Sequence, residues 1–187
     1  MNAEMLISIA LGIGLAASAG FRVFLPLFAL SLFAYFGLWP LSSGWQWLAS
    51  PAALVILGVA TFAEIGAYLI PWLDNALDSI AIPLAGAAGT VAVVSTQADL
   101  NPAITWALAI IGGGGVAAAI KTGMGSTRLA STATTGGLAN PVVSIAETGA
   151  GLVVTLLSLL VPITAIFILF IIAVWLWRKW QRKPQIS

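Results

Sequence analysis

The chain has 187 residues, of which 60% are hydrophobic and only 7% are charged. Soluble domains carry about 25% charged residues, so this composition excludes an ordinary soluble domain. The sequence contains no cysteine and no histidine, which excludes disulfides, thiolate chemistry and imidazole-ligated metal sites.

Apolar segments follow one another along the whole chain. A helix of about 20 residues crosses a bilayer, and continuous apolar runs favour helices over the alternating pattern of a membrane β-barrel. We therefore predict an all-α polytopic membrane protein, folded as one transmembrane domain over residues 1–187 and surrounded by membrane lipids. The six expected spans cover residues 5–36, 52–72, 79–96, 104–121, 140–160 and 162–178.

Two of these segments depart from an ordinary span. Residues 5–36 are too many for one crossing, and Arg22 and Pro26 lie near their middle. Because proline bends or ends helices, we expect a break or a strong tilt there. The fourth segment contains four consecutive glycines at 112–115, which are tolerated where backbones approach closely or a helix bends.

The basic residues predict an orientation. Four bases follow the last span, so the positive-inside rule places the C-terminus in the cytoplasm, and six spans put the N-terminus there too. The same count makes residues 122–139, which are rich in glycine, serine and threonine, a cytoplasmic loop. The four bases of the tail at 178–187 are Arg178, Lys179, Arg182 and Lys183.

Two pairs of short segments indicate an internal repeat. TFAEIGA at 61–67 resembles SIAETGA at 144–150, and each lies in the second span of its half. GIGLAAS at 12–18 resembles GGGVAAA at 113–119, each in the first span of its half. Three spans per half reverse the orientation, so the pattern predicts inverted repeats, which usually enclose a binding site between broken helices.

The predicted repeats divide the chain into two parts. The first covers about residues 5–96, with the broken segment at its start, and the second covers about residues 104–178, with the glycine-rich segment at its start. The first helix of each half is therefore expected to be broken or glycine-rich.

Two glutamates lie inside predicted spans, Glu64 in the second and Glu147 in the fifth. A carboxylate at the bilayer centre costs about 2.5–3.5 kcal/mol, so such residues are functional candidates by default. The alternatives are an ion or proton site that faces a central cavity, and buried carboxylates that fix helix packing with Arg22 or Lys121 as partner. Polar residues at helical spacing share their faces: Thr61 and Tyr68 for the first, Asn140 and Ser144 for the second.

Further charges lie near the ends of spans. Asp74 and Asp78 share one helix face, which indicates either a cation site or a solvated helix start; two carboxylates alone are a weak metal signal, so no metal or cofactor is expected. Lys121 and Arg128 lie among hydroxyls and glycines, a set that suits phosphate or a lipid headgroup, or a plain flexible loop. The Walker pattern of nucleotide sites is missing.

Three blocks of residues resemble the bacterial and plastid family called domain of unknown function 4126. They read E…IP..D...D....P..G at 64–86, K......R at 121–128 and NP..S..E at 140–147. The resemblance implies a bacterial inner membrane or a thylakoid-type membrane and no defined activity. This chain departs from the family at Tyr68, Leu69, Ile82 and Thr148, where charged residues are common in the family. A shorter similarity links FRVFLP at 21–26 to the DedA-type lipid-carrier transporters.

These observations predict a small transporter or channel-like protein whose polar pathway for a small ion or solute runs between the repeats. Arg22, Glu64 and Glu147 would line it. The alternatives are a translocator or binder of anionic lipid headgroups, and a non-transporting scaffold or assembly factor. No catalytic set is evident, so we expect no enzyme. We expect no nucleic-acid partner, and a homo-oligomer is compatible with the pattern.

Overall fold

The structure is a computed structural model that describes residues 3–97 and 100–181. Side chains are described within these ranges except at residues 71, 72, 74–76, 79, 163–167, 169, 173, 176, 180 and 181. The described residues form only helices and their connections, which confirms the all-α prediction. The elements are α1 (Ala3–Phe21), α2 (Leu25–Tyr35), the 3-10 helix η1 (Ser43–Ala49), α3 (Pro51–Ala67), α4 (Pro71–Thr96), α5 (Pro102–Ala107), the π-helix η2 (Leu108–Gly114), α6 (Gly115–Thr135), α7 (Asn140–Leu160) and α8 (Pro162–Gln181).

Several of these helices are long and apolar enough to cross a membrane. Among the described residues they are Ala3–Phe21, the continuous helical run Pro102–Thr135, and Asn140–Leu160. A fourth candidate is the pair Ser43–Ala49 and Pro51–Ala67, if the two helices, bent by 67°, count as one span. The helices therefore support a membrane protein, whereas a total of six spans stays a prediction.

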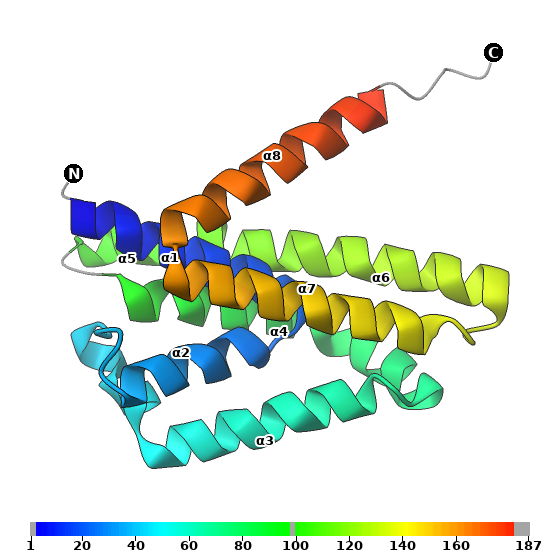
Figure 1. The fold of residues 1–187 in the computed structure, drawn as a ribbon, viewed down its shortest axis with the longest axis horizontal. Helices are drawn as coiled ribbons and strands as arrows, with labels where there is room; N and C mark the ends of the chain where they lie inside the picture. Colours follow the sequence, from blue (N-terminus) through cyan, green and yellow to red (C-terminus); the bar gives the residue numbers. More distant parts are fainter. Residues whose placement is uncertain (1–2, 98–99, 182–187) are drawn as a thin grey trace.

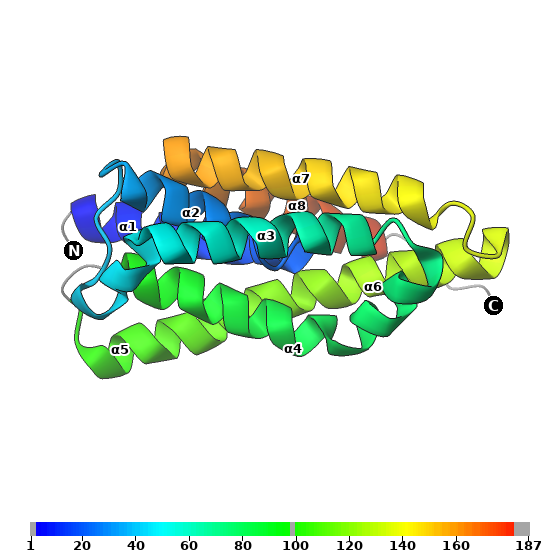
Figure 2. The same ribbon diagram turned by 90° about the horizontal axis from the view of Figure 1, so that it is seen from below.

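The first apolar segment folds back on itself. α1 ends at Phe21 and α2 begins at Leu25, so the predicted break at Arg22 is confirmed. Glu4 at the start of α1 lines the same cleft as Trp39 beyond the end of α2. Figures 1 and 2 likewise show α2 running back toward the start of α1. The prediction of a single span over residues 5–36 is wrong, because the chain reverses at the break.

This reversal changes the predicted topology. From α3 onward the long helices run back and forth along the molecule, and the start of α1 and the end of α8 lie at opposite ends (Figures 1 and 2). If the chain crosses a membrane along this axis, the start of α1 and the end of α8 lie on opposite sides of it. The helix directions therefore do not support the prediction that both ends of the chain are cytoplasmic.

The stretch predicted as a cytoplasmic loop at 122–139 is mostly helix. α6 continues to Thr135, and the turn that follows contains Gly136 and Gly137 with φ of 63° and 88°. Hydroxyls in this part of α6 bond back to the carbonyl four residues earlier, as Thr122 does to Ala118 at 2.8 Å. The local composition suggested a loop, but most of these hydroxyls bond within the helix. Thr132 instead bonds to Asn140 of α7, and the buried hydroxyl of Ser131 has no partner among the described residues. Lys121 and Arg128, seven residues apart, are both buried on it.

The glycine run allows α4 and the π-helix η2 to pack backbone against backbone. A methyl group at Gly89 would lie 2.6 Å from the carbonyl oxygen of Gly113, and one at Gly114 would lie 3.0 Å from the carbonyl oxygen of Gly86. No side chain fits between them. The prediction of close approach is confirmed for Gly113 and Gly114, two of the four glycines in the run. α1 packs against α4 in the core through Leu11, Leu15 and Ala19.

We expect Gly113→Ala to lower the free energy of unfolding by about 1–3 kcal/mol, because the new methyl group overlaps the backbone of α4. Gly123→Ala is the matched control. It lies on α6 with nothing within 4 Å of its added methyl group, so helix propensity should raise the free energy of unfolding by up to about 1 kcal/mol. Thermal unfolding in detergent measures both, and equal effects of the two changes would disprove the close approach.

Single cysteines test the hairpin, since the chain has no cysteine of its own. Cysteines at Ala3 and Ser43 should react with a membrane-impermeant maleimide from the same side of the membrane. A cysteine at Lys179 should react only from the other side. Labelling of Ala3→Cys and Ser43→Cys from opposite sides would mean that residues 5–36 cross the membrane as one span.

Candidate functional site

The break between α1 and α2 is held by a carboxylate from α3. The backbone N–H of Val23 donates to Glu64 Oε1 at 2.8 Å, and that of Phe24 donates to Glu64 Oε2 at 3.0 Å. The first N–H groups of a helix lack partners inside the helix and carry partial positive charge. Glu64, only 7% exposed, therefore caps α2 from a neighbouring helix.

A lysine from α6 occupies the other side of the break. Lys121 Nζ donates to the carbonyl oxygen of Phe21 at 3.3 Å, where α1 ends. The last carbonyls of a helix carry partial negative charge, which a cation stabilises. Each end of the broken helix thus faces a buried side chain of opposite charge, Glu64 at the start of α2 and Lys121 at the end of α1.

Arg22 lies in the break itself and is completely buried. Its Nε donates to Thr148 Oγ1 at 2.9 Å. Its Nη2 donates to the carbonyl oxygen of Ser144 at 2.8 Å and to Ser144 Oγ at 2.5 Å, and lies 3.9 Å from a carboxylate oxygen of Glu147. Its Nη1 has no hydrogen-bond partner among the described residues. One corner of this buried guanidinium is therefore left for another acceptor.

The strongest ion pair joins α6 to α7. Arg128 Nε donates to Glu147 Oε1 at 3.1 Å, and Arg128 Nη2 contacts Glu147 Oε2, so the pair is bidentate. Arg128 Nη1 also lies 3.4 Å from Asp78 Oδ1, whose side chain is 29% exposed. The sequence indicated Arg22 or Lys121 as the partner of Glu147. The main partner is Arg128 instead, because the predicted loop at 122–139 is mostly helix and turns Arg128 toward the interior.

Tyr68, at the end of α3, lies among three cations. The centre of its ring is 4.5 Å from Arg22 Cζ, 4.9 Å from Lys121 Nζ and 4.1 Å from Arg128 Cζ. The negative face of an aromatic ring attracts cations, so Tyr68 reduces the repulsion between them. The sequence indicated Tyr68 only as a polar neighbour of Glu64, and its position one helical turn further along was the available signal.

Most of the predicted site residues meet in this charged cluster. We define it as Arg22, Glu64, Tyr68, Lys121, Arg128, Ser144, Glu147 and Thr148, with Asp78 at its edge. Thr148 was missed by the sequence-based prediction.

Two other predicted residues, Thr61 and Asn140, play different parts. The buried Thr61 bonds to the carbonyl of Leu57 on its own helix at 2.8 Å. Asn140 donates to Thr132 Oγ1 at 3.1 Å and thereby ties α6 to α7. The side chain of Asp74 lies outside the described ones. Among the described residues, no group of three or more acidic, histidine or cysteine side chains is arranged to hold a metal ion.

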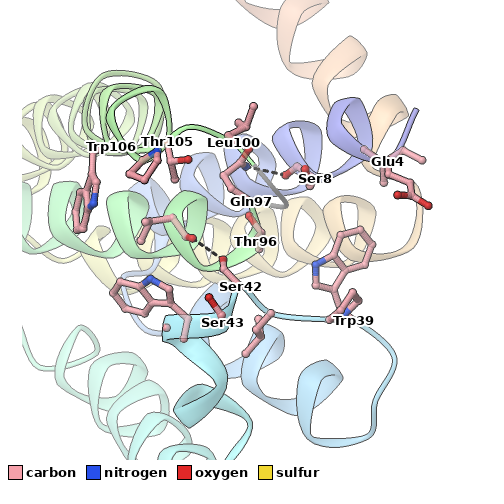
Figure 3. Close-up of a pocket in the computed structure, with 17 residues that line it drawn as sticks. Glu4, Ser8, Trp39, Ser42, Ser43, Thr96, Gln97, Leu100, Thr105 and Trp106 are labelled. Carbon is pink, nitrogen blue, oxygen red and sulfur yellow. Dashed lines mark hydrogen bonds between the residues drawn. The ribbon is translucent and has the colours of Figure 1, made fainter. Parts of the chain in front are cut away.

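We describe two clefts in the surface of the protein. Neither is lined by a charged residue of the cluster. A groove of about 300 Å³ between α3 and α7 reaches Ser144 and Thr148, the two residues that bond Arg22. A larger cleft of about 800 Å³ lies at the end of the molecule where α1 begins (Figure 3). The charged cluster itself is closed in this conformation.

We expect Glu147→Gln to lower the free energy of unfolding by about 3 kcal/mol, because the buried Arg128 loses its bidentate carboxylate partner and keeps only the longer contact with the partly exposed Asp78. Glu4→Gln, the same change at an exposed position, should stay within about 0.5 kcal/mol of the parent protein. Thermal unfolding of the purified proteins gives the comparison. If Glu147→Gln unfolds like Glu4→Gln, the ion pair contributes nothing to stability.

Comparison with known proteins gives one match. No curated protein and no solved structure matches the chain significantly, and the weaker similarity to the DedA-type transporters is not shown. A family model described as a domain of unknown function, DUF4126, matches residues 9–182, nearly the whole chain. The chain therefore belongs to the DUF4126 family.

Proposed function

We propose that this protein is an integral membrane transporter that carries a small anion through the region around the tip of the α1–α2 hairpin. The proposal rests mainly on the break at Arg22, where two helix ends and three buried cations meet within an apolar bundle. Non-helical backbone at membrane depth is tolerated only where protein buries it or where it lines a cavity. Transporters commonly use such half-helix ends to bind ions and charged solutes.

The occupied bonds favour an anion over a cation. Both oxygens of Glu64 accept backbone N–H groups, and both oxygens of Glu147 contact Arg128. A cation would have to displace these donors. An anion finds Arg22 Nη1 without a partner among the described residues. Three buried cations against two buried carboxylates also leave the interior of the cluster positive, before the partly exposed Asp78 is counted.

In this proposal the structure is an occluded conformation of the transporter, in which the anion site at the charged cluster is closed to both sides of the membrane. The groove between α3 and α7 ends at Ser144 and Thr148, so separation of these two helices would open a path to Arg22. α3 and α7 run in opposite directions (Figure 1), and we propose that AEIGA on α3 and AETGA on α7 are related by an inverted repeat. The other predicted pair, 12–18 and 113–119, does not fit an inverted repeat, because α1 and the run from η2 to α6 lie parallel: a methyl group at Gly112 would meet Ile13, and one at Gly20 would meet Ile120. Arg178 and Lys179 lie in the last turn of α8, so we propose by the positive-inside rule that this end faces the cytoplasm.

Two other functions have specific support. The groove between α3 and α7 is lined by Ile65, Leu69, Ile145 and Leu152 as well as the two hydroxyl residues, which suits an acyl chain whose anionic headgroup is translocated. The bonded and buried charges suit a scaffold in which they only lock helices together. Replacement of such networks by apolar residues is often neutral or stabilising, so stability alone is a weak reason to keep them.

Flux measurements in phosphatidylcholine vesicles test the proposal. The purified protein is reconstituted, a potassium gradient with valinomycin sets the voltage, and uptake of chloride, nitrate and phosphate is compared with uptake of sodium. We expect flux of at least one anion above that of empty vesicles. Arg22→Lys keeps the charge but loses the hydrogen bonds of the guanidinium, and a loss of about 1.5–3 kcal/mol predicts a decrease of about tenfold or more.

Arg178→Lys, at an exposed position in the last turn of α8, is the matched control and should leave flux unchanged. Scrambling of fluorescent phosphatidylglycerol in the same vesicles tests the lipid alternative. Absence of any anion flux with correctly folded protein would overturn the proposal, and absence of lipid scrambling as well would leave the scaffold. An unchanged rate in Arg22→Lys would remove Arg22 from the pathway.

A further inference from the structure

The large cleft at the end of the molecule where α1 begins shares no residue with the charged cluster. It has a volume of about 800 Å³, which lies in the usual range of ligand sites. Its walls come from the start of α1, the connection between α2 and η1, the end of α4, and α5. Figure 3 shows side chains from these separate segments facing one shared space.

Two buried polar atoms on the walls of this cleft lack hydrogen-bond partners among the described residues. They are the indole nitrogen of Trp39 and the amide oxygen of Gln97. Gln97 is only 4% exposed, and its amide nitrogen donates to the carbonyl oxygen of Ser8 at 3.2 Å, which fixes the side chain. Buried polar groups are nearly always paired, so an unpaired donor and an unpaired acceptor on one cleft require a ligand or water.

The chemistry of these atoms restricts the ligand. The indole N–H can only donate and the amide oxygen can only accept, so a hydroxyl group, which accepts and donates, satisfies both kinds of atom. Among the described residues that line the cleft, Glu4 is the one charged side chain and none is a base. That charge disfavours an anion, which separates this cleft from the charged cluster.

Aromatic side chains complete the walls. Trp39, Trp45 and Trp106 line the cleft, and they lie at the end of the molecule opposite Arg178 and Lys179, which is the non-cytoplasmic end by the positive-inside rule. Tryptophan offers a flat apolar face together with one donor. Sugar rings combine flat C–H faces with hydroxyl groups. The C–H faces can pack on the tryptophan rings, and the hydroxyl groups can pair with the unpaired donor and acceptor of the cleft.

We propose that this cleft binds a neutral sugar, either as the headgroup of a glycolipid in the outer leaflet or as a free sugar. The hydroxyls of the ring would pair with Trp39 and Gln97, and its C–H face would pack on a tryptophan. This site does not depend on the proposed transport activity.

The test uses the full chain in phosphatidylcholine nanodiscs, because sugar-based detergents would themselves fill the cleft. One arm titrates methyl β-glucoside and follows tryptophan fluorescence; the other includes monoglucosyl diacylglycerol and measures retained lipid by native mass spectrometry. Saturable binding in the first arm supports a free sugar, and in the second arm alone a glycolipid. Lack of saturable binding in both arms overturns the proposal.

Matched variants locate the site. Trp39→Phe keeps an aromatic ring but loses the donor, and we expect about tenfold weaker binding. Trp47→Phe is the control, since Trp47 is 57% exposed and does not line the cleft; its binding should equal that of the parent chain. Gln97→Met, which removes the acceptor, is the second variant if Trp39→Phe fails to fold. Equal binding by the folded cleft variants and the control would place the sugar elsewhere and overturn the proposal.

Discussion

The carboxylate of Glu64 holds the rest of this structure in place. By accepting the backbone N–H groups of Val23 and Phe24, it supplies the partners that an isolated helix start would lack in an apolar environment. The chain can then stop α1, turn and begin α2 inside the bundle. Lys121 stabilises the opposite helix end through the carbonyl of Phe21. Without these two side chains, the reversal would leave unpaired backbone groups where water is excluded.

The hairpin in turn determines where the other charges lie. Its tip carries Arg22 to α7, where Ser144 and Thr148 accept its hydrogen bonds, and this brings a third cation beside Lys121 and Arg128. Three cations in one apolar interior repel one another strongly, and the ring of Tyr68, the two glutamates and Asp78 reduce that repulsion. Elsewhere in the bundle, α4 and η2 pack backbone against backbone and leave no room for a side chain at Gly89 or Gly113.

Local patterns in the sequence predicted the features that depend on single residues. The length of the first apolar run, with Arg22 and Pro26 near its middle, indicated a break or a strong tilt, and the glycine run indicated close backbone contact or a bend. Glu64 and Glu147 had to face inward because a carboxylate in lipid is costly. The direction of α2 was not predictable, since the hydrogen bonds that reverse the chain come from α3, some 40 residues further along. The helical state of residues 122–135 was missed because glycine, serine and threonine favour loops in isolation, whereas here Lys121 and Arg128 find buried partners along one face of the helix.

We propose that the charged cluster at the hairpin tip is an anion site rather than a set of fixed helix contacts. The most direct measurement is anomalous diffraction from crystals of the full chain grown in a lipid phase with bromide. We expect a bromide peak inside the bundle, in contact with Arg22 Nη1 and near the ring of Tyr68. Bromide found only at exposed bases such as Arg178 and Lys179, with the interior of the cluster unchanged, would contradict it.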